Sequence, residues 1–212
     1  MMKPLRLLLL GAAVAAVALG AGTARALACG NSAGYSYVHM RVPSHGYGIS
    51  ARIAGPDVFD ILNGHTAGFV GVGGPGQGPR GSNEWLQVGY AGFPSITGGD
   101  IYYEIARPGS FPAYHQVSSS VTVDRYTKVT VLEMYDRPNY WRVWVNHRPV
   151  SRPIFLPESR GLKLIARSES WDGGTGGACN DFSYRFRDLA IARAPGGDWE
   201  PITDAIYPIQ ST

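Results

Sequence analysis

The chain has 212 residues and a formal net charge of +3, and only 17% of its residues are charged. Three of the 19 basic residues, Lys3, Arg6 and Arg25, lie near the N-terminus, whereas all 16 acidic residues come later. Without that N-terminal segment the balance is 16 basic residues minus 16 acidic residues, or zero. A neutral chain with no basic run argues against nucleic acid as a partner.

The N-terminus has the order of an export signal. Lys3 and Arg6 precede an apolar run over 7–19, and Ala26-Leu27-Ala28 supplies small residues for cleavage. Glycines and Arg25 interrupt the apolar stretch before it reaches the roughly 20 residues of a membrane span. We therefore expect a secreted protein whose signal peptide is residues 1–28.

The chain that remains is the size of one domain. We expect a β-sandwich domain over residues 29–195. The tail over residues 196–212 has no clear apolar period, so we expect a poorly packed extension.

The chain has two cysteines, Cys29 and Cys179. In an exported protein two thiols are expected to form one disulfide, here between the mature N-terminus and a late loop. The alternative is a lipid anchor on Cys29, although Ala26 stands where lipid-attachment signals favour Leu. We expect no other association with a membrane.

Short segments of alternating or β-branched residues recur between Gly, Pro, Asn and Asp, and no sustained 3.6-residue period indicates a long helix. This spacing predicts an all-β sandwich or barrel. The predicted strands are 35–42, 48–53, 68–72, 85–90, 101–106, 117–123, 128–135, 140–145, 162–168 and 184–192.

The clearest local prediction is a hairpin in which residues 129–135 meet residues 140–145 across the turn 136–139. Alternation places Tyr140, Arg142 and Trp144 on one face of the second strand. The opposite face is predicted to lie in the core and holds Trp141, Val143 and Val145.

Several familiar catalytic patterns are missing from the sequence. The glycine-rich stretch 71–81 lacks the Gly-Lys-Ser/Thr ending of a phosphate loop, and the five histidines do not form a His-Glu-x-x-His motif. There is no Gly-x-Ser-x-Gly elbow, and Cys179 is expected to be oxidised rather than reactive. We therefore expect no metal and no cofactor.

Three polar residues, Gln87, Glu104 and Glu169, stand among apolar or aromatic neighbours in predicted strands. Alternation puts Gln87 on one face with Trp85, opposite Leu86 and Val88, while Glu104 shares a face with Tyr102. If the aliphatic faces form the interior, the polar faces line an open concave surface, where a sheet can bind substrate.

A series of motifs over residues 48–193 resembles the glutamic peptidases called eqolisins. The motifs are Gly68-Phe69-Val70-Gly71-Val72, Trp85-Leu86-Gln87-Val88-Gly89, Tyr102-Tyr103-Glu104, a segment around Glu169, and a closing strand over 184–190. The resemblance implies an all-β, concanavalin A-like β-sandwich (jelly roll) of antiparallel strands.

The resemblance also implies roles for individual residues. Gln87 and Glu169 match the catalytic pair of an acid-active endopeptidase, and Phe69, Trp85, Tyr102 and Glu104 lie where substrate is bound. Glu169 would activate a water molecule as general base, and the Gln87 amide would donate a hydrogen bond to the oxyanion formed on a peptide carbonyl. The implied substrate is extracellular polypeptide.

Two departures leave other functions open. Phe69 stands where the family has Trp, and Ser170 separates Glu169 from Trp171. A non-catalytic carbohydrate-binding module is the first alternative, and a glycoside hydrolase that uses Glu104 and Glu169 is the second. The aromatic residues considered for sugar stacking are Trp85, Tyr90, Tyr102, Tyr140 and Trp144.

A structural interpretation also stands beside these functions. A glutamine next to tryptophan on a strand is often a cross-strand hydrogen-bonding residue. Glu104 and Glu169 could equally form ordinary ion pairs with arginines. The arginines considered are Arg107, Arg167 and Arg185.

Overall fold

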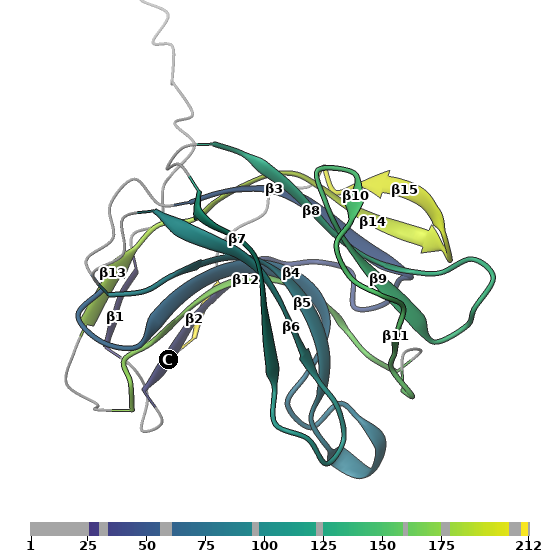
Figure 1. Ribbon diagram of the computed structural model, residues 1–212, viewed down its shortest axis with the longest axis horizontal. Helices are drawn as coiled ribbons and strands as arrows, with labels where there is room; N and C mark the ends of the chain where they lie inside the picture. Colours follow the sequence, from purple (N-terminus) through teal and green to yellow (C-terminus); the bar gives the residue numbers. More distant parts are fainter. Residues whose placement is uncertain are drawn as a thin grey trace, which may run out of the picture.

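A computed structural model describes residues 26–29, 34–55, 61–94, 98–121, 125–158, 161–174, 179–203 and 209–211. Within these residues the chain forms two seven-stranded antiparallel sheets packed face to face (Figure 1). A separate two-stranded sheet joins β1 (Ala26–Cys29) to β13 (Cys179–Phe182). The predicted β-sandwich is therefore confirmed.

The first sheet, called the outer sheet, lies uppermost in Figure 1. Its two-residue strand β11 (Ile154–Phe155) pairs with β9 (Tyr140–Val145) beside the main path. In order, the main path is β10 (Arg148–Pro149), β9 (Tyr140–Val145), β8 (Thr127–Glu133), β3 (Gly48–Ala54), β14 (Arg185–Ala194) and β15 (Gly197–Pro201).

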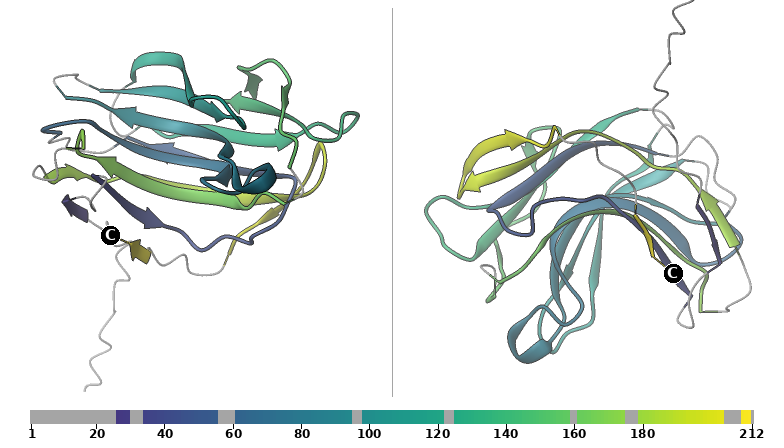
Figure 2. Two further views of the ribbon diagram at one scale, coloured as in Figure 1. Left: turned by 90° about the horizontal axis from the view of Figure 1, so that it is seen from below. Right: turned by 180° about the vertical axis from the view of Figure 1, so that it is seen from behind.

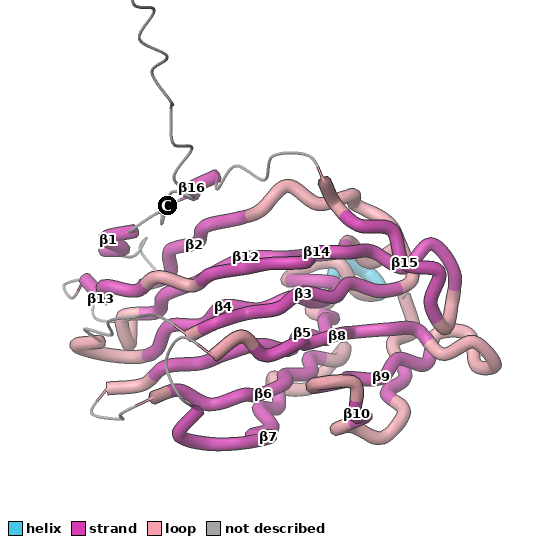
Figure 3. The backbone as a smooth tube through the Cα atoms, turned by 90° about the horizontal axis from the view of Figure 1, so that it is seen from above, coloured by secondary structure: helices cyan, strands magenta, loops and turns pink. Residues whose placement is uncertain are grey.

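The second sheet, called the curved sheet, arches so that its concave face points away from the outer sheet (Figures 1 and 2). The strands of the two sheets run in nearly the same direction (Figure 3), which is the aligned type of sheet packing. In order, the curved sheet contains β16 (Ile209–Ser211), β2 (Tyr35–His39), β12 (Leu164–Trp171), β4 (His65–Gly74), β5 (Glu84–Gly92), β6 (Gly99–Ala106) and β7 (Ala113–Val121).

The core lies between the two sheets and is built by strict alternation along the strands. On β5, Leu86 and Val88 are fully buried and point toward the outer sheet, as predicted. The outer sheet meets them with aliphatic and aromatic side chains in the same cluster. These include Ile49, Ile53, Val129, Val131, Trp141, Val143 and Ile191.

The predicted hairpin is confirmed as β8 and β9, with Val131 opposite Val143 in the register. The backbone N–H of Met134 closes the turn on the carbonyl of Tyr140 at 2.8 Å. Trp141 and Val143 are fully buried, whereas Trp144 on the other face is only half-buried. The predicted assignment of the two faces is correct.

The tail contains structure that the sequence pattern did not reveal. Its strand β15 pairs with β14 at the edge of the outer sheet, and β16 pairs with β2 at the edge of the curved sheet. Edge strands of three to five residues carry too few side chains to show an alternating pattern. The tail therefore extends both sheets.

The predicted signal segment falls mostly outside the described residues. Ala26–Cys29 form β1, so this strand holds three residues of the predicted signal peptide and the first residue after the cleavage point. The described part of the chain has no helix long and apolar enough to cross a bilayer. Its only helical segment is the 3-10 turn η1 (Pro79–Gly81).

Candidate functional site

The concave face of the curved sheet gathers the polar residues that the sequence singled out. Gln87 on β5 is the register partner of Glu104 on β6 and of Gly71 on β4. Glu169 on β12 is the register partner of Ala67 on β4. All of the predicted catalytic and substrate-binding residues come from β4, β5, β6 and β12.

Gln87 lies in the floor of this face. Its Nε2 donates a hydrogen bond to the Tyr102 hydroxyl oxygen at 3.2 Å. Tyr102 in turn stacks on Tyr114, with ring centroids 5.0 Å apart. Gln87 and Tyr102 are only 4% and 3% exposed, so the surface predicted to be open is buried at its floor. The stacked neighbouring ring accounts for this difference at Tyr102.

Phe69 also lies in the floor and is fully buried. It packs in a small cluster with Tyr102, and the Arg167 guanidinium lies 5.1 Å from the Phe69 ring centre. The same guanidinium lies 4.7 Å from the ring of Tyr37. Arg167 therefore covers aromatic rings by cation–π contact.

Glu104 is held by Trp85, whose indole Nε1 donates to Oε1 at 2.8 Å. Burial raises the pKa of the Glu104 carboxyl above its usual range. The hydrogen bond from Trp85 lowers this pKa, and the charge of Glu169 raises it further. Glu104 therefore tends to hold a proton where an exposed glutamate would have lost it.

Glu169 is 8% exposed and lies beside His65, with 3.6 Å between Oε1 and the His65 Nε2. The His65 ring packs against Trp171, with centroids 5.6 Å apart. An imidazole therefore stands next to this carboxylate. Its oxygens face the concave side between aromatic rings.

Gln87 and Glu169 are separated by β4, and neither side chain hydrogen-bonds the other within the described residues. In a flat sheet their offset of four residues and two strands would set the Cα atoms roughly 17 Å apart. Burial raises the pKa of both Tyr102 and Glu104, and the charge of Glu169 adds to the rise. These two residues are the hydrogen-bond partner and the register partner of Gln87.

Aromatic residues of β2 form one wall of the concave face, and the sequence interpretation missed them. Tyr35 stacks on Tyr37 with ring centroids 5.8 Å apart, and on Trp171 at 6.0 Å. Burial and the charge of Glu169 raise the pKa of Tyr37 to about 12. The spacing of Tyr35, Tyr37 and His39 at every second residue was the signal for this wall.

The aromatic residues considered for sugar stacking do not share one surface. Trp85 and Tyr102 lie on the concave face, whereas Tyr90 is 1% exposed and belongs to the core between the sheets. Tyr140 and Trp144 lie on the outer sheet. Only the first two can take part in a site at the concave face.

The remaining predicted site residues are the two cysteines. The register of β1 and β13 places Cys29 directly opposite Cys179. No cluster of three or more His, Cys, Asp or Glu residues suited to a metal ion occurs within the described ranges.

No family model and no curated protein matches the chain by sequence. Among solved structures, scytalido-glutamic peptidase with a peptide-based transition-state analogue is similar, at 15% identity and a TM-score of 0.49, over 80% of this chain and 87% of that one. A carbohydrate-binding module of family 66 from Bacillus subtilis has 9% identity and a TM-score of 0.43, over 79% and 90%.

The catalytic domain of an endo-1,3-β-glucanase (laminarinase) from Thermotoga petrophila has 8% identity and a TM-score of 0.46, over 79% of this chain and 77% of that one. These structures share the two-sheet β-sandwich fold with this chain. They do not establish membership of a family.

Proposed function

We propose that the protein is a secreted glutamic endopeptidase that cleaves extracellular polypeptide at the concave face of the curved sheet. The observation that carries the proposal is that Gln87 on β5, Glu104 on β6 and Glu169 on β12 lie on one face of the curved sheet. Glu104 is the register partner of Gln87, and its pKa is raised by burial and, to a smaller extent, by the charge of Glu169. In this proposal the amide and the carboxylate act on a substrate from the same face.

In the proposed reaction, ionised Glu169 takes a proton from a water molecule whose oxygen attacks the peptide carbonyl carbon. The resulting oxyanion accepts a hydrogen bond from the Gln87 amide, which is neutral and can donate at any pH. Glu169 then transfers the proton to the leaving amine as the carbon–nitrogen bond breaks. Because Glu104 holds its proton in acid, acidic conditions reduce the negative charge beside the site.

The test is hydrolysis of a denatured protein between pH 2 and 7, with the wild-type chain and the Gln87→Ala and Glu169→Gln variants. Removal of an oxyanion donor is expected to lower kcat by about 100- to 1,000-fold. Gln116→Ala is the matched control, because Gln116 lies exposed on β7 and bonds Asp100 at 2.8 Å. Equal activity in all four proteins, or activity in none, would contradict the proposal.

The aromatic wall of β2 favours a second candidate function at the same face, which is carbohydrate binding without catalysis. Stacked, half-buried rings such as those of Tyr35 and Tyr37 can contact the apolar side of a sugar ring. Glycan-array binding that is lost in Trp85→Ala but retained in Glu169→Gln would support this alternative. Sugar hydrolysis lost in both Glu104→Gln and Glu169→Gln would instead support a glycoside hydrolase.

A further inference from the structure

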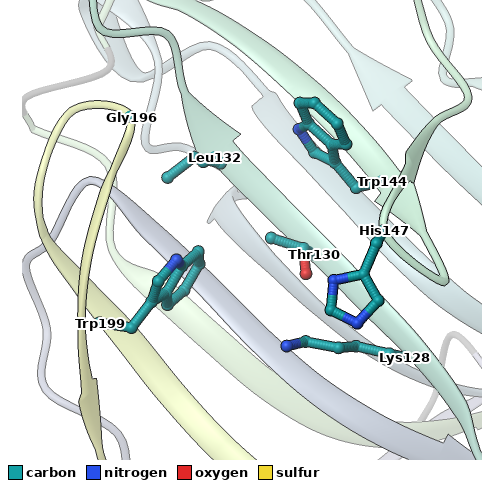
Figure 4. A pocket seen from close by; sticks show the side chains of 7 residues that line it. All are labelled: Lys128, Thr130, Leu132, Trp144, His147, Gly196 and Trp199. Atoms are coloured by element: carbon teal, nitrogen blue, oxygen red, sulfur yellow. The ribbon is translucent and has the colours of Figure 1, made fainter.

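A hollow lies on the solvent side of the outer sheet, on the opposite side of the sandwich from the concave face. Trp144 of β9 and Trp199 of β15 form its two walls (Figure 4). Three strands, β8, β3 and β14, separate them in the sheet, which sets their backbones about 19 Å apart. Trp199 is 40% exposed, although tryptophan is usually buried to a larger extent.

Small residues form the floor between the two tryptophans, where Thr130 is 8% and Ser50 is 2% exposed. Thr130 is the register partner of Trp144 on one side and of Ser50 on the other, and Ser50 faces Ala190. The Thr130 hydroxyl donates to the Ser50 hydroxyl at 3.0 Å. The Thr130 oxygen can still accept a hydrogen bond from a ligand hydroxyl. The side chains of the floor are therefore small and mostly polar, and a large indole ring stands on either side of them.

The chemistry of the hollow is cationic. Lys128 and His147 lie together at one end, and the hollow has no acidic residue in its lining (Figure 4). Within the described part of the chain, Lys128 forms no ion pair. A lysine that has no ion pair with a described residue, beside a histidine and two tryptophans, can receive an anionic group on a ligand that also has apolar surface.

A second hollow adjoins the first. The two share Leu132, Trp144 and Gly196. The second adds Tyr135 and Arg142, together with the carboxylates of Glu133 and Asp136, so the site for an acidic group is the first hollow, at Lys128. Tyr135 is 84% exposed, so it adds a further accessible ring. A surface of two adjoining hollows that share a tryptophan fits a chain of several repeating units better than a single small molecule.

We propose that this face of the outer sheet binds an acidic oligosaccharide, one whose pyranose rings carry carboxylates. A pyranose presents C–H groups on its faces and hydroxyls at its edge, which matches aromatic walls beside hydrogen-bonding groups. Trp199 and Trp144 receive the ring faces, Lys128 receives a carboxylate, and Thr130 accepts from a hydroxyl. Such a site would hold the protein on an acidic polysaccharide while the concave face stays free.

The proposal is tested by titrating the full exported chain with tetragalacturonate and, separately, with the neutral cellotetraose. In two-dimensional NMR the five tryptophans give separate indole N–H signals. Those of Trp144 and Trp199 are expected to shift with tetragalacturonate, whereas that of Trp85 stays in place. Calorimetry is expected to show at least tenfold weaker binding of tetragalacturonate in Trp199→Ala and in Lys128→Met.

Lys163→Met, at an exposed lysine outside the lining of the hollow, is the matched control for Lys128→Met and is expected to bind tetragalacturonate like the wild type. Gln87→Ala is expected to do the same, so failure of the peptidase proposal would leave this result unchanged. The proposal is overturned if neither indole signal shifts in the wild-type chain, or if binding survives both Trp199→Ala and Lys128→Met. Shifts of the same two signals with an unfolded polypeptide, but not with tetragalacturonate, would assign the face to peptide and also overturn it.

Discussion

The indole Nε1 of Trp85 donates a hydrogen bond of 2.8 Å to Oε1 of Glu104, on the neighbouring strand of the concave face. This bond stabilises the ionised carboxylate, while burial and the charge of Glu169 favour the protonated acid. One indole N–H therefore partly offsets the tendency of a buried acid to keep its proton.

Replacement of this donor gives the first prediction. In Trp85→Phe the pKa of Glu104 should rise further, because the ring remains but the hydrogen bond to the ionised form is lost. The carboxyl ¹³C signal of Glu104 followed during a pH titration measures this shift. Trp199→Phe, on the other sheet, should leave the titration unchanged. A lower pKa in Trp85→Phe would show that the bond does not act in this way.

The second prediction concerns stability and pH. Because the folded-state pKa of Glu104 lies above its unfolded value, its contribution is fully present below about pH 4.3 and is lost as the pH rises through the folded pKa. Glutamine does not titrate, so Glu104→Gln removes this loss of stability at higher pH. The free energy of unfolding of the variant, relative to wild type, should therefore increase from pH 3.5 to pH 7.5 in urea titrations.

A residue of the outer sheet provides a control for which the opposite change of stability with pH is expected. Glu200 is exposed, and its hydrogen bond to Arg193 lowers its pKa. Its stabilising contribution is present above the unfolded pKa and is lost as the pH falls through the folded pKa. Glu200→Gln should thus lose stability relative to wild type toward neutral pH. The same trend in both variants would contradict the assigned causes.

The third prediction concerns Gly71, the residue opposite Gln87 on the neighbouring strand. A Cβ atom on Gly71 would lie 2.5 Å from the Leu86 carbonyl oxygen and 2.9 Å from the Gln87 Cα, and neither backbone atom can move freely. Gly71→Ala should lower the free energy of unfolding by about 1–3 kcal/mol and also reduce hydrolysis. The control is Gly161→Ala, whose nearest atom would be an ordinary contact at 3.5 Å. Full activity in Gly71→Ala would show that β4 can move away.

The fourth prediction compares two leucines. Leu86 is fully buried between the sheets, whereas Leu62 is 58% exposed. Leu86→Ala should cost about 2–5 kcal/mol of stability because it leaves a cavity. Leu62→Ala should stay within about 0.5 kcal/mol of wild type in the same denaturant titration. Equal losses would mean that β5 does not contribute its aliphatic face to the core.

The fifth prediction concerns the cysteines. Cys29 lies opposite Cys179 in the register, and Cys29 is the β1 residue that remains after the expected cleavage. We predict a disulfide between the two cysteines, and its reduction should cost about 2–5 kcal/mol. Peptide mapping of the exported protein without reductant should find the two cysteine peptides joined. A lipid-modified N-terminal peptide would instead assign Cys29 to an anchor. The same spectrum reports whether cleavage follows Ala28.

Alternation was the part of the fold that could be read from the sequence. Leu86 and Val88, like Trp141 and Val143, repeat at every second residue, and this period depends only on strand geometry. The strands that escaped prediction, such as β10 and β11, have two residues each and no period. Their positions depend on the strand with which they pair, so a local pattern in the sequence does not predict them.

The site was only partly predictable for a related reason. Pattern and resemblance selected Gln87, Glu104 and Glu169, and the structure places all three on one face. The contact of Glu169 with His65 and the stacking of Tyr102 on Tyr114 arise from packing between strands, so no local pattern encodes them. Burial of the floor follows from those contacts.

The two proposed catalytic side chains reach the concave face by different routes. Gln87 lies on β5, one of the consecutive antiparallel strands β4 to β7. Neighbours in the chain pair with one another in this part of the sheet, and such local pairing forms readily. Glu169 arrives only when β12 pairs with β4, opposite Ala67, a separation of 169 − 67 = 102 residues. Closing this loop costs more entropy than closing the short loops between β4 and β7, and the cost grows slowly with loop length. The concave face is therefore complete only once β12 has paired with β4, and the two residues of the proposed catalytic pair share a face only in the fully paired sheet.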